Sequence, residues 1–209
     1  MSEIQSRSSL RLILALCGVA APIVFTIFVV AESMLRPGYS QISNYVSDLG
    51  VGSNAILQSV NFWITGILTV ASAIGLRLGL SGDGWAPRAG PGLVGIGGIG
   101  LILAGFFPDA PDPYPGDVHL FAAFLFFLGV ILAIFVTRSV QDANPNWSGY
   151  GKVSLMFGLA AVVAALLFVA MPTSYVGLFE RVLIVPLFLW IGIMSWKQFT
   201  LFSSPADPS

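Results

Sequence analysis

The side chains of this chain that are suited to chemistry lie in two short segments, at residues 40–48 and 107–119. They are Ser43, Ser47, Asp48, Asp109, Asp112 and His119. A histidine can act as a general base, a carboxylate can orient it, and a serine hydroxyl can attack a substrate or position water. Ser47, Asp48 and His119 are therefore candidate catalytic residues of a hydrolase or transferase. Ser43 is the alternative hydroxyl, and Asp112 is the alternative carboxylate.

The same groups fit two other roles. The three aspartates and the imidazole could hold a divalent cation, because carboxylate oxygens and one imidazole are workable ligands, although no spacing here is specific to a metal. They could instead form a hydrogen-bond network that pins loops to helix ends in a protein without a ligand. Asp117, for example, is placed to cap the helix that follows it. The sequence names no cofactor.

The composition indicates what must position these residues. Of 209 residues, 9% are charged and 56% are hydrophobic, and the mean hydropathy is +0.88. So few charges could not keep a monomer this apolar in solution, which excludes a soluble globular fold. The nine Lys and Arg residues do not cluster, which argues against nucleic acid as a partner. The single cysteine, Cys17, excludes a disulfide framework.

Six apolar runs are long enough to cross a bilayer as helices, since about 20 residues span about 30 Å. We expect an all-α bundle of six transmembrane helices forming one domain over residues 1–209. The expected spans are residues 10–31, 54–80, 89–107, 118–138, 151–171 and 178–201. The first run is about 21 residues long, longer than the 7–15 typical of a signal peptide, so we expect it to stay uncleaved.

The basic residues predict the orientation of the bundle. With both termini in the cytoplasm, the basic residues on the inner side are Arg7, Arg11, Arg77, Arg88, Arg138, Lys152 and Lys197. Only Arg36 and Arg181 then lie outside, in agreement with the positive-inside rule. We expect an integral protein of a prokaryotic plasma membrane with cytoplasmic N- and C-termini, so the chemistry-bearing segments face outward.

Two patterns predict how the spans pack. The third span carries many glycines, which favours a central position with neighbouring helices pressed on its backbone. The second span carries a polar stripe on one helical face that should point into the bundle. Its members are Gln58, Asn61, Thr65, Thr69 and Ser72. The stripe either forms hydrogen bonds between helices or lines a polar cavity that opens outward.

The first outer loop and the start of the sixth span add two expectations. Between Gly38 and Gly50, polar residues recur at helical spacing opposite an apolar face, which predicts an amphipathic interfacial helix of about three turns. Glu180 and Arg181 are adjacent, so they diverge by about 100° and one of them should face the bundle. A charge there needs a partner, and Asp48 or Asp112 is a candidate for Arg181.

Several of these segments resemble a known family. Residues 39–50 read Tyr-Ser-Gln-Ile-Ser-Asn-Tyr-Val-Ser-Asp-Leu-Gly, Asn61 follows in the second span, residues 105–109 read Gly-Phe-Phe-Pro-Asp, and His119 opens the fourth span. Together they resemble the prokaryotic membrane proteins grouped as domain of unknown function nine-nine-eight. The resemblance implies a six-helix fold and no particular activity. Its signature positions would be Ser43, Ser47, Asp48, Asp109 and His119.

More distant similarities involve the same positions. The damage-regulated autophagy modulator and glycosylphosphatidylinositol-remodelling families also pair a Ser-Asp in the first outer loop with a His that opens a later span. The zinc site of the seven-span alkaline ceramidases, which uses three His residues, does not transfer, because this chain has one His.

We expect an outward-facing polar pocket that binds a lipid or another small amphiphile, since a few convergent polar groups in apolar walls make a binding site. The ligand-binding candidates are Ser43, Asn61, Asp109, Asp112, Glu180 and Arg181. The partners expected are membrane lipids and no nucleic acid, and the oligomeric state stays open. One alternative is a membrane-embedded hydrolase or transferase that acts on a lipid through Ser, Asp and His, with or without a metal ion. The other is a structural or accessory membrane protein without a ligand.

Overall fold

The computed structural model describes residues 2–109 and 113–204. Six long helices follow one another: α1 Ser2–Leu35, α2 Ala55–Gly79, α3 Ala86–Phe106, α4 Pro113–Ala143, α5 Tyr150–Ala170 and α6 Val176–Ser203. Three short 3₁₀ helices join them: η1 Ser47–Gly50, η2 Pro145–Trp147 and η3 Thr173–Tyr175. All six long helices are long and apolar enough to cross a membrane, and the described residues contain no strand. The all-α, six-span fold is therefore confirmed.

The fourth span is longer than the sequence indicated. Helix α4 begins at Pro113 rather than at residue 118, and it ends at Ala143 rather than at residue 138. The early start is compatible with helix geometry, because the first turn needs no backbone N–H partner and therefore tolerates proline.

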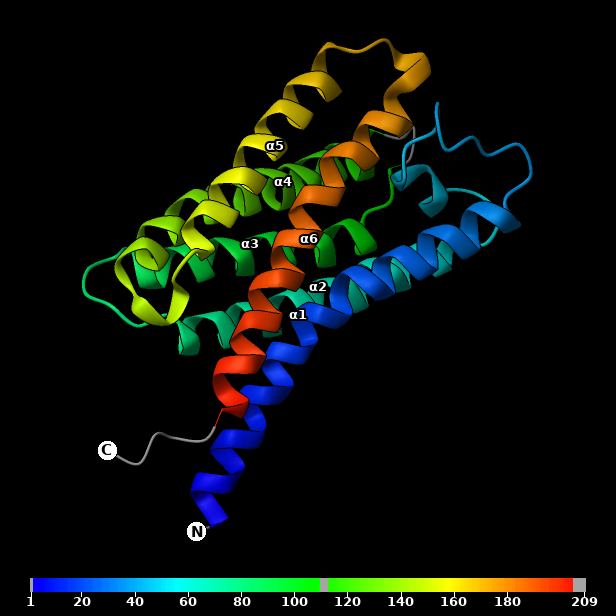
Figure 1. Cartoon of the computed structure of the whole chain (residues 1–209). Helices are drawn as coiled ribbons and strands as arrows, with labels where there is room; N and C mark the ends of the chain where they lie inside the picture. The colour runs from blue at the N-terminus through cyan, green and yellow to red at the C-terminus, as the bar shows by residue number, and fades with distance from the viewer. Residues whose placement is uncertain (1, 110–112, 205–209) are drawn as a thin grey trace.

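The helices alternate in direction and form a closed bundle (Figure 1). Helix α3 packs between α2 and α4, α5 packs against α4 and α6, and α1 packs against α2 and α6. Helices α1 and α6 touch where a Cβ added to Gly18 would lie 2.7 Å from the Cβ of Ser195. Beyond this contact, α1 and α6 diverge toward the end of the bundle that carries residues 36–54 (Figure 1). We call residues 36–54 the cap segment and this end the cap end.

Glycines bring α3 against its neighbours, as the sequence predicted. A Cβ on Gly66 of α2 would lie 2.6 Å from the carbonyl oxygen of Gly98 on α3. A Cβ on Gly100 would lie 3.0 Å from the backbone nitrogen of Phe126 on α4. Backbones this close gain the packing contacts that hold helices together in lipid, where the hydrophobic effect supplies little force between helices.

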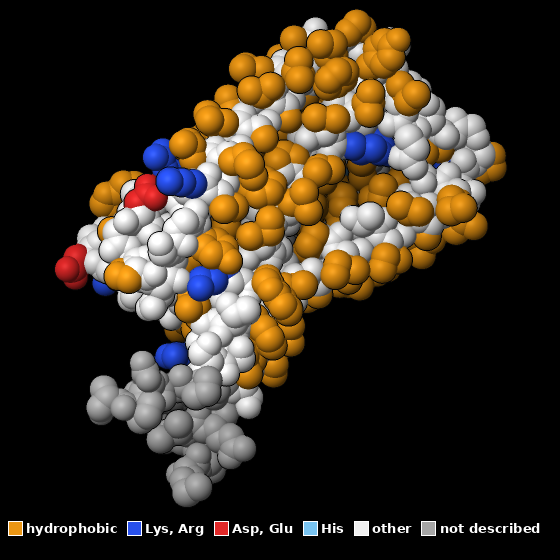
Figure 2. Space-filling model, viewed as in Figure 1, with side chains coloured by type: hydrophobic (Ala, Val, Ile, Leu, Met, Phe, Trp, Pro, Cys, Tyr) orange, Lys and Arg blue, Asp and Glu red, His pale blue; other side chains and the backbone are white. Residues whose placement is uncertain are grey.

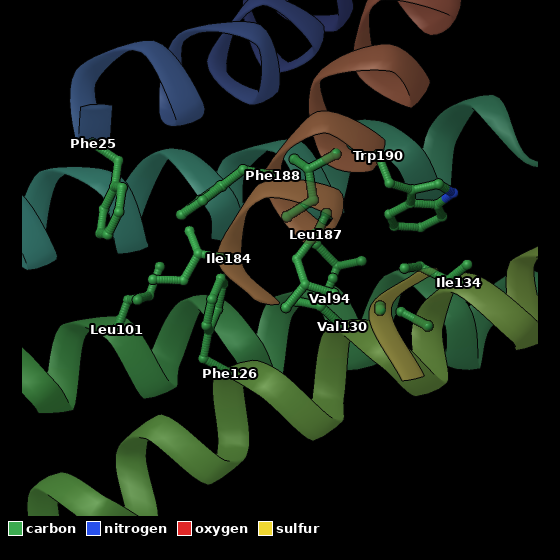
Figure 3. Close-up of a cluster of buried hydrophobic side chains, with 14 of the residues drawn as sticks. Phe25, Val94, Leu101, Phe126, Val130, Ile134, Ile184, Leu187, Phe188 and Trp190 are labelled. Atoms are coloured by element: carbon green, nitrogen blue, oxygen red, sulfur yellow. The ribbon is translucent and has the colours of Figure 1, made fainter. Parts of the chain in front are cut away.

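A core of large apolar side chains fills the space between α1, α3, α4 and α6 (Figure 3). The Phe188 ring lies at its centre, 4.8 Å from the Phe25 ring and 5.3 Å from the Phe126 ring, measured between centroids. Ile184 and Leu101 extend this cluster toward the cap end, and Trp190 lies toward the opposite end (Figure 3). The cluster fixes the spacing of the helices that carry the polar groups described below.

The polar stripe of α2 faces the interior, as predicted. Its five side chains are at most 2% exposed. Asn61 donates to the Gln58 side chain at 3.0 Å, and Thr65 donates to the Asn61 side chain at 3.2 Å. These residues do not line the cavity or the grooves described below. The stripe is therefore a chain of hydrogen bonds inside the bundle.

The amphipathic helix expected in the cap segment does not form. The segment consists of turns followed by the single 3₁₀ turn η1. The Ser40 hydroxyl accepts the N–H groups of residues 42 and 43, both at 3.3 Å, and the Asn44 side chain accepts the N–H of Ser40 at 3.0 Å. Short polar side chains that bind nearby backbone groups compete with helix formation. The prediction of a three-turn helix was therefore wrong, although polar residues do recur at helical spacing in this segment.

Candidate functional site

The cap segment is fixed to the bundle through the peptide groups of Val46. The Val46 N–H donates to a carboxylate oxygen of Glu180 on α6 at 2.5 Å. The Val46 carbonyl accepts from the side chain of Gln58 on α2 at 3.2 Å. Val46 is 2% exposed, and Glu180 is 8% exposed. Of the two adjacent charges at the start of α6, Glu180 is thus the one that faces the bundle.

Arg181 and its neighbours hold the rest of the cap segment. The guanidinium donates to the carbonyls of Asn44 at 3.1 Å and Gly177 at 2.8 Å, and also to the hydroxyl of Tyr39. The Tyr39 hydroxyl in turn donates to the carbonyl of Tyr45 at 2.8 Å. Burial raises the pKa of the Tyr39 phenol, and the Arg181 charge partly offsets this. The phenol therefore stays protonated and able to donate at neutral pH.

Asp48 shapes the cap segment from within. Its carboxylate accepts the N–H of Tyr45 at 2.9 Å and the side-chain amide of Asn44 at 3.1 Å. It makes no ion pair with Arg181 in the described structure, so the pairing expected between them was wrong; the amides of its own loop occupy the carboxylate instead. Asp112, the other expected partner, lies outside the described residues. The contacts of Asp48 match the loop-pinning alternative.

A small cavity lies beneath the cap segment. It measures about 40 Å³, and its polar lining comes from Ser47, His119 and Glu180. Its apolar lining includes Phe25, Val46, Phe62, Leu101, Phe126 and Ile184. Each buried water needs roughly 10–15 Å³ measured in this way. The cavity thus has room for a few water molecules but not for a lipid headgroup.

The histidine in this cavity has a defined tautomer. His119 is 6% exposed, and its Nδ1 lies 2.8 Å from the carbonyl oxygen of Phe107. A carbonyl only accepts hydrogen bonds, so Nδ1 carries the hydrogen and the neutral ring keeps its lone pair on Nε2. The Ser47 hydroxyl donates to a carboxylate oxygen of Asp109 at 3.1 Å. The cavity therefore brings a potential base and a hydroxyl to the same space, whereas Asp48 does not line it.

A larger groove runs along the flank of the bundle between α1 and α6. It measures about 390 Å³. Its lining residues are Pro22, Phe25, Thr26, Val29, Val30, Gln41, Val46, Arg181, Ile184, Val185, Phe188 and Leu189. Figure 2 shows a hollow on this flank, with hydrophobic side chains inside it and a basic side chain at its rim. We call it the α1–α6 groove; Phe25, Val46 and Ile184 separate it from the cavity.

The structure places the predicted site residues in different parts of the cap end. Ser47, His119 and Glu180 line the cavity, with Asp109 bonded to Ser47, while Arg181 lines the groove. Asn61 is fully buried in the α2 stripe, and Ser43 is exposed, with its N–H bonded to Ser40. The groove residues of α1 were not predicted, because a lipid-facing wall and a groove wall have the same apolar composition.

The expected metal set is not assembled in the part of the chain that the structure describes. Within residues 9–109 and 116–204, whose side chains the structure describes, no three His, Cys, Asp or Glu side chains gather closely enough to hold a metal ion. Asp112, one of the expected ligands, lies outside the described residues. Asp48 binds its own loop, and Asp109 binds Ser47.

A family model matches most of the chain. The model described as Protein of unknown function (DUF998) matches residues 19–197, which includes the cap segment, the cavity and the groove. No curated protein and no solved structure matches the chain.

Proposed function

The chain belongs to the family described as Protein of unknown function (DUF998), and we propose that it binds a membrane lipid or another amphiphile in the α1–α6 groove. The observation that carries this proposal is the composition of the groove. Its walls are apolar along α1 and α6, and its polar lining is confined to Thr26, Gln41 and Arg181. Apolar walls with a few placed polar groups are typical of sites for small molecules.

The two helices present matching faces to an elongated ligand. The groove residues of α1 recur at 22, 25, 26, 29 and 30, and those of α6 recur at 181, 184, 185, 188 and 189. Each set follows the spacing of a single helical face. Eight residues of helix rise roughly 12 Å, which is enough to hold much of one acyl chain. The cation at the cap end would then meet the headgroup.

The distribution of basic residues supports an orientation in which this headgroup lies in the outer leaflet. Arg77, Arg88, Arg138, Lys152 and Lys197 lie near the helix ends opposite the cap segment. The positive-inside rule puts that end, and with it both termini, in the cytoplasm. We therefore place the protein in a plasma membrane with the cap segment outside, and the ligand enters the groove sideways from the surrounding lipid.

The proposal is tested by blocking the groove with a side chain. Val30 lines the groove and is 48% exposed, whereas Ile27 on the same helix is 61% exposed and does not line it. Lipids retained after purification in mild detergent are quantified by mass spectrometry for the wild type, Val30→Trp and Ile27→Trp. We expect Val30→Trp alone to lose the retained lipid at unchanged thermal stability. Equal lipid in all three proteins would refute the proposal.

The cavity supports a second candidate function, a hydrolase or transferase that acts on the same lipid. The observation that favours it is the tautomer of His119, which leaves the Nε2 lone pair as a base in a cavity that shares a wall with the groove. This nitrogen would take the proton from a water molecule or from Ser47 as either attacks the lipid's ester carbonyl, and would return it to the alcohol oxygen as the ester C–O bond breaks. An acyl group left on Ser47 would then be released as fatty acid by a water molecule.

This second function is tested by measuring whether the protein hydrolyses a phospholipid. Purified protein in vesicles of an ester-linked phospholipid should release fatty acid, and His119→Gln should abolish the release because it removes the base. Ser43→Ala is the control, because Ser43 is exposed and does not line the cavity. The absence of release by the wild type, or equal release by His119→Gln, would eliminate the catalytic function.

A further inference from the structure

We infer that the amphiphile in the α1–α6 groove is an anionic phospholipid whose phosphate contacts Arg181. This inference rests on the proposed function and adds the chemical class of the ligand. It comes from the way Arg181 is satisfied, through neutral hydrogen-bond acceptors and with one buried donor left without a partner among the described residues.

Arg181 forms no direct ion pair in the described structure, although the charge of the adjacent Glu180 carboxylate acts on it through space. Its guanidinium donates to two carbonyls and one phenol hydroxyl, all of them neutral. Glu180 gives its carboxylate to the Val46 N–H on the cavity side, and Asp48 gives its carboxylate to Asn44 and Tyr45. Arg138, at the opposite end, shows the usual alternative, an ion pair with Asp142 at 3.3 Å.

The guanidinium also keeps an unused donor. Nε of Arg181 is buried and has no hydrogen-bond partner among the described residues. A guanidinium partly withdrawn from water without a direct ion pair is costly, and the cost falls when an anion binds it. Arginine is suited to this role, because its planar fork matches the paired oxygens of a phosphate.

The position of the charge matches the shape of a phospholipid. Arg181 lies at the cap end of the groove, and Val185, Phe188 and Leu189 continue from it along the same face of α6. A phosphate at Arg181 therefore places the attached acyl chain along the apolar walls. Gln41 of the cap segment lines the same end of the groove and adds an amide. A phosphodiester stays ionised across the physiological pH range, so it offsets the Arg181 charge at all times.

A second groove on the protein provides an internal control. It lies between α5 and α6, measures about 600 Å³, and its lining residues are Met156, Phe157, Leu159, Ala160, Val163, Ala164, Leu167, Val182, Val185, Pro186 and Leu189. No charged or polar side chain is among them. We call it the α5–α6 groove and expect any lipid that fills it to bind without regard to headgroup charge.

The inference is tested with full-length protein in nanodiscs that contain phosphatidylglycerol and phosphatidylcholine of identical chains in equal amounts. Native mass spectrometry counts the lipids that stay bound. The wild type should retain phosphatidylglycerol about tenfold over phosphatidylcholine, equivalent to about 1.4 kcal/mol. Arg181→Gln should retain lipid without this preference, and Arg138→Gln, the matched arginine control, should keep it.

Two further variants separate charge from folding. Arg181→Lys keeps the cation, so it should keep part of the preference even if the cap segment loosens. Val30→Trp fills the groove and leaves the Arg181 residue unchanged, so it should abolish the preference in a stable protein. A wild type that retains both lipids equally, or that prefers a fatty acid added in competition, overturns the inference and leaves the proposed function standing. Equal retention by the wild type and Val30→Trp overturns both.

Discussion

The two grooves on either side of α6 have similar walls but different ends. Val185 and Leu189 line both of them. The α5–α6 groove is the larger, and its lining is entirely apolar, whereas the α1–α6 groove ends at the cap segment with Gln41 and Arg181. In a bilayer, an apolar groove is filled by whatever acyl chain is nearest, so size alone confers no selectivity. The polar end therefore distinguishes a binding site from an ordinary lipid-facing surface.

The cap segment builds that polar end, so the largest effect on the comparison should come from detaching it. A Cβ on Gly177 would collide with the backbone of Asn44. Gly177→Ala should destabilise the protein by about 3 kcal/mol, at the upper end of overpacking costs, and remove lipid selectivity. Gly92→Ala is the control, because a Cβ there meets nothing within 4 Å. Thermal unfolding in detergent measures the stability of both variants. Equal stability of the two would contradict the role of Gly177.

The next effect concerns the hydrogen bond between Glu180 of α6 and the N–H of Val46. Val46 lines the α1–α6 groove but not the α5–α6 groove. Glu180→Ala leaves the buried Val46 N–H without its acceptor, which should cost about 2 kcal/mol. Glu180→Gln keeps an acceptor oxygen and should lose less than half as much. Thermal unfolding of both variants measures this difference. If they lose the same stability, the contact of Glu180 with Val46 is not what holds the cap segment.

A gain of function would sharpen the comparison. Val182 lines the α5–α6 groove near the start of α6 and is 40% exposed. Val182→Arg gives that groove the cation that it lacks, because a long side chain near a helix end can extend toward the interface. It should create a second site that prefers phosphatidylglycerol about fivefold, or about 1 kcal/mol, by native mass spectrometry. Val182→Gln, whose side chain is polar but neutral, should not create this site. Equal lipid preference in the two variants would show that charge does not determine selectivity.

The smallest effect is expected at Tyr39. Tyr39→Phe removes the hydroxyl between Arg181 and Tyr45 and should cost no more than about 1 kcal/mol. Because burial raises the pKa of Tyr39, the folded protein holds the phenol proton more tightly than the unfolded chain does. Stability should therefore fall as the pH rises above about 10, the pKa of a free tyrosine.

Unfolding monitored between pH 8 and pH 11 tests this expectation. The decline should be shallower in Tyr39→Phe than in the wild type, since the variant has lost one group whose pKa is raised. Parallel pH profiles would show that Tyr39 does not contribute to the decline.

The sequence predicted the features that depend on local periodicity. Apolar runs revealed the six spans, and the spacing of Gln58, Asn61 and Thr65 placed them on a buried face. The same logic failed in the cap segment, because Ser40, Asn44 and Asp48 bind nearby backbone groups instead of presenting one face of a helix. Helical spacing shows at which positions polar residues occur. It does not show whether their side chains form hydrogen bonds with nearby backbone groups and so prevent a helix.

The site was less predictable because it depends on tertiary packing. The sequence showed that either Glu180 or Arg181 faces the bundle, but not that Glu180 does. The α1–α6 groove follows from the close contact of Gly18 with Ser195 and from the divergence of the two helices beyond it. The sequence of neither helix indicates this groove, since an exposed valine such as Val30 suits a groove wall and a lipid-facing surface equally well.

Photolabelling tests the proposed binding site most directly. A phosphatidylglycerol with a photoactivatable group in its acyl chain is added to the full-length protein in membranes, and labelled peptides are identified by mass spectrometry. We predict saturable labelling of α1 around Thr26 and Val30 and of α6 around Phe188, which line only the α1–α6 groove, abolished by excess unlabelled phosphatidylglycerol. Labelling of α5 around Val163 should be weak and should not saturate. Labelling spread evenly over α1, α5 and α6, unaffected by competitor, would contradict a specific site in the α1–α6 groove.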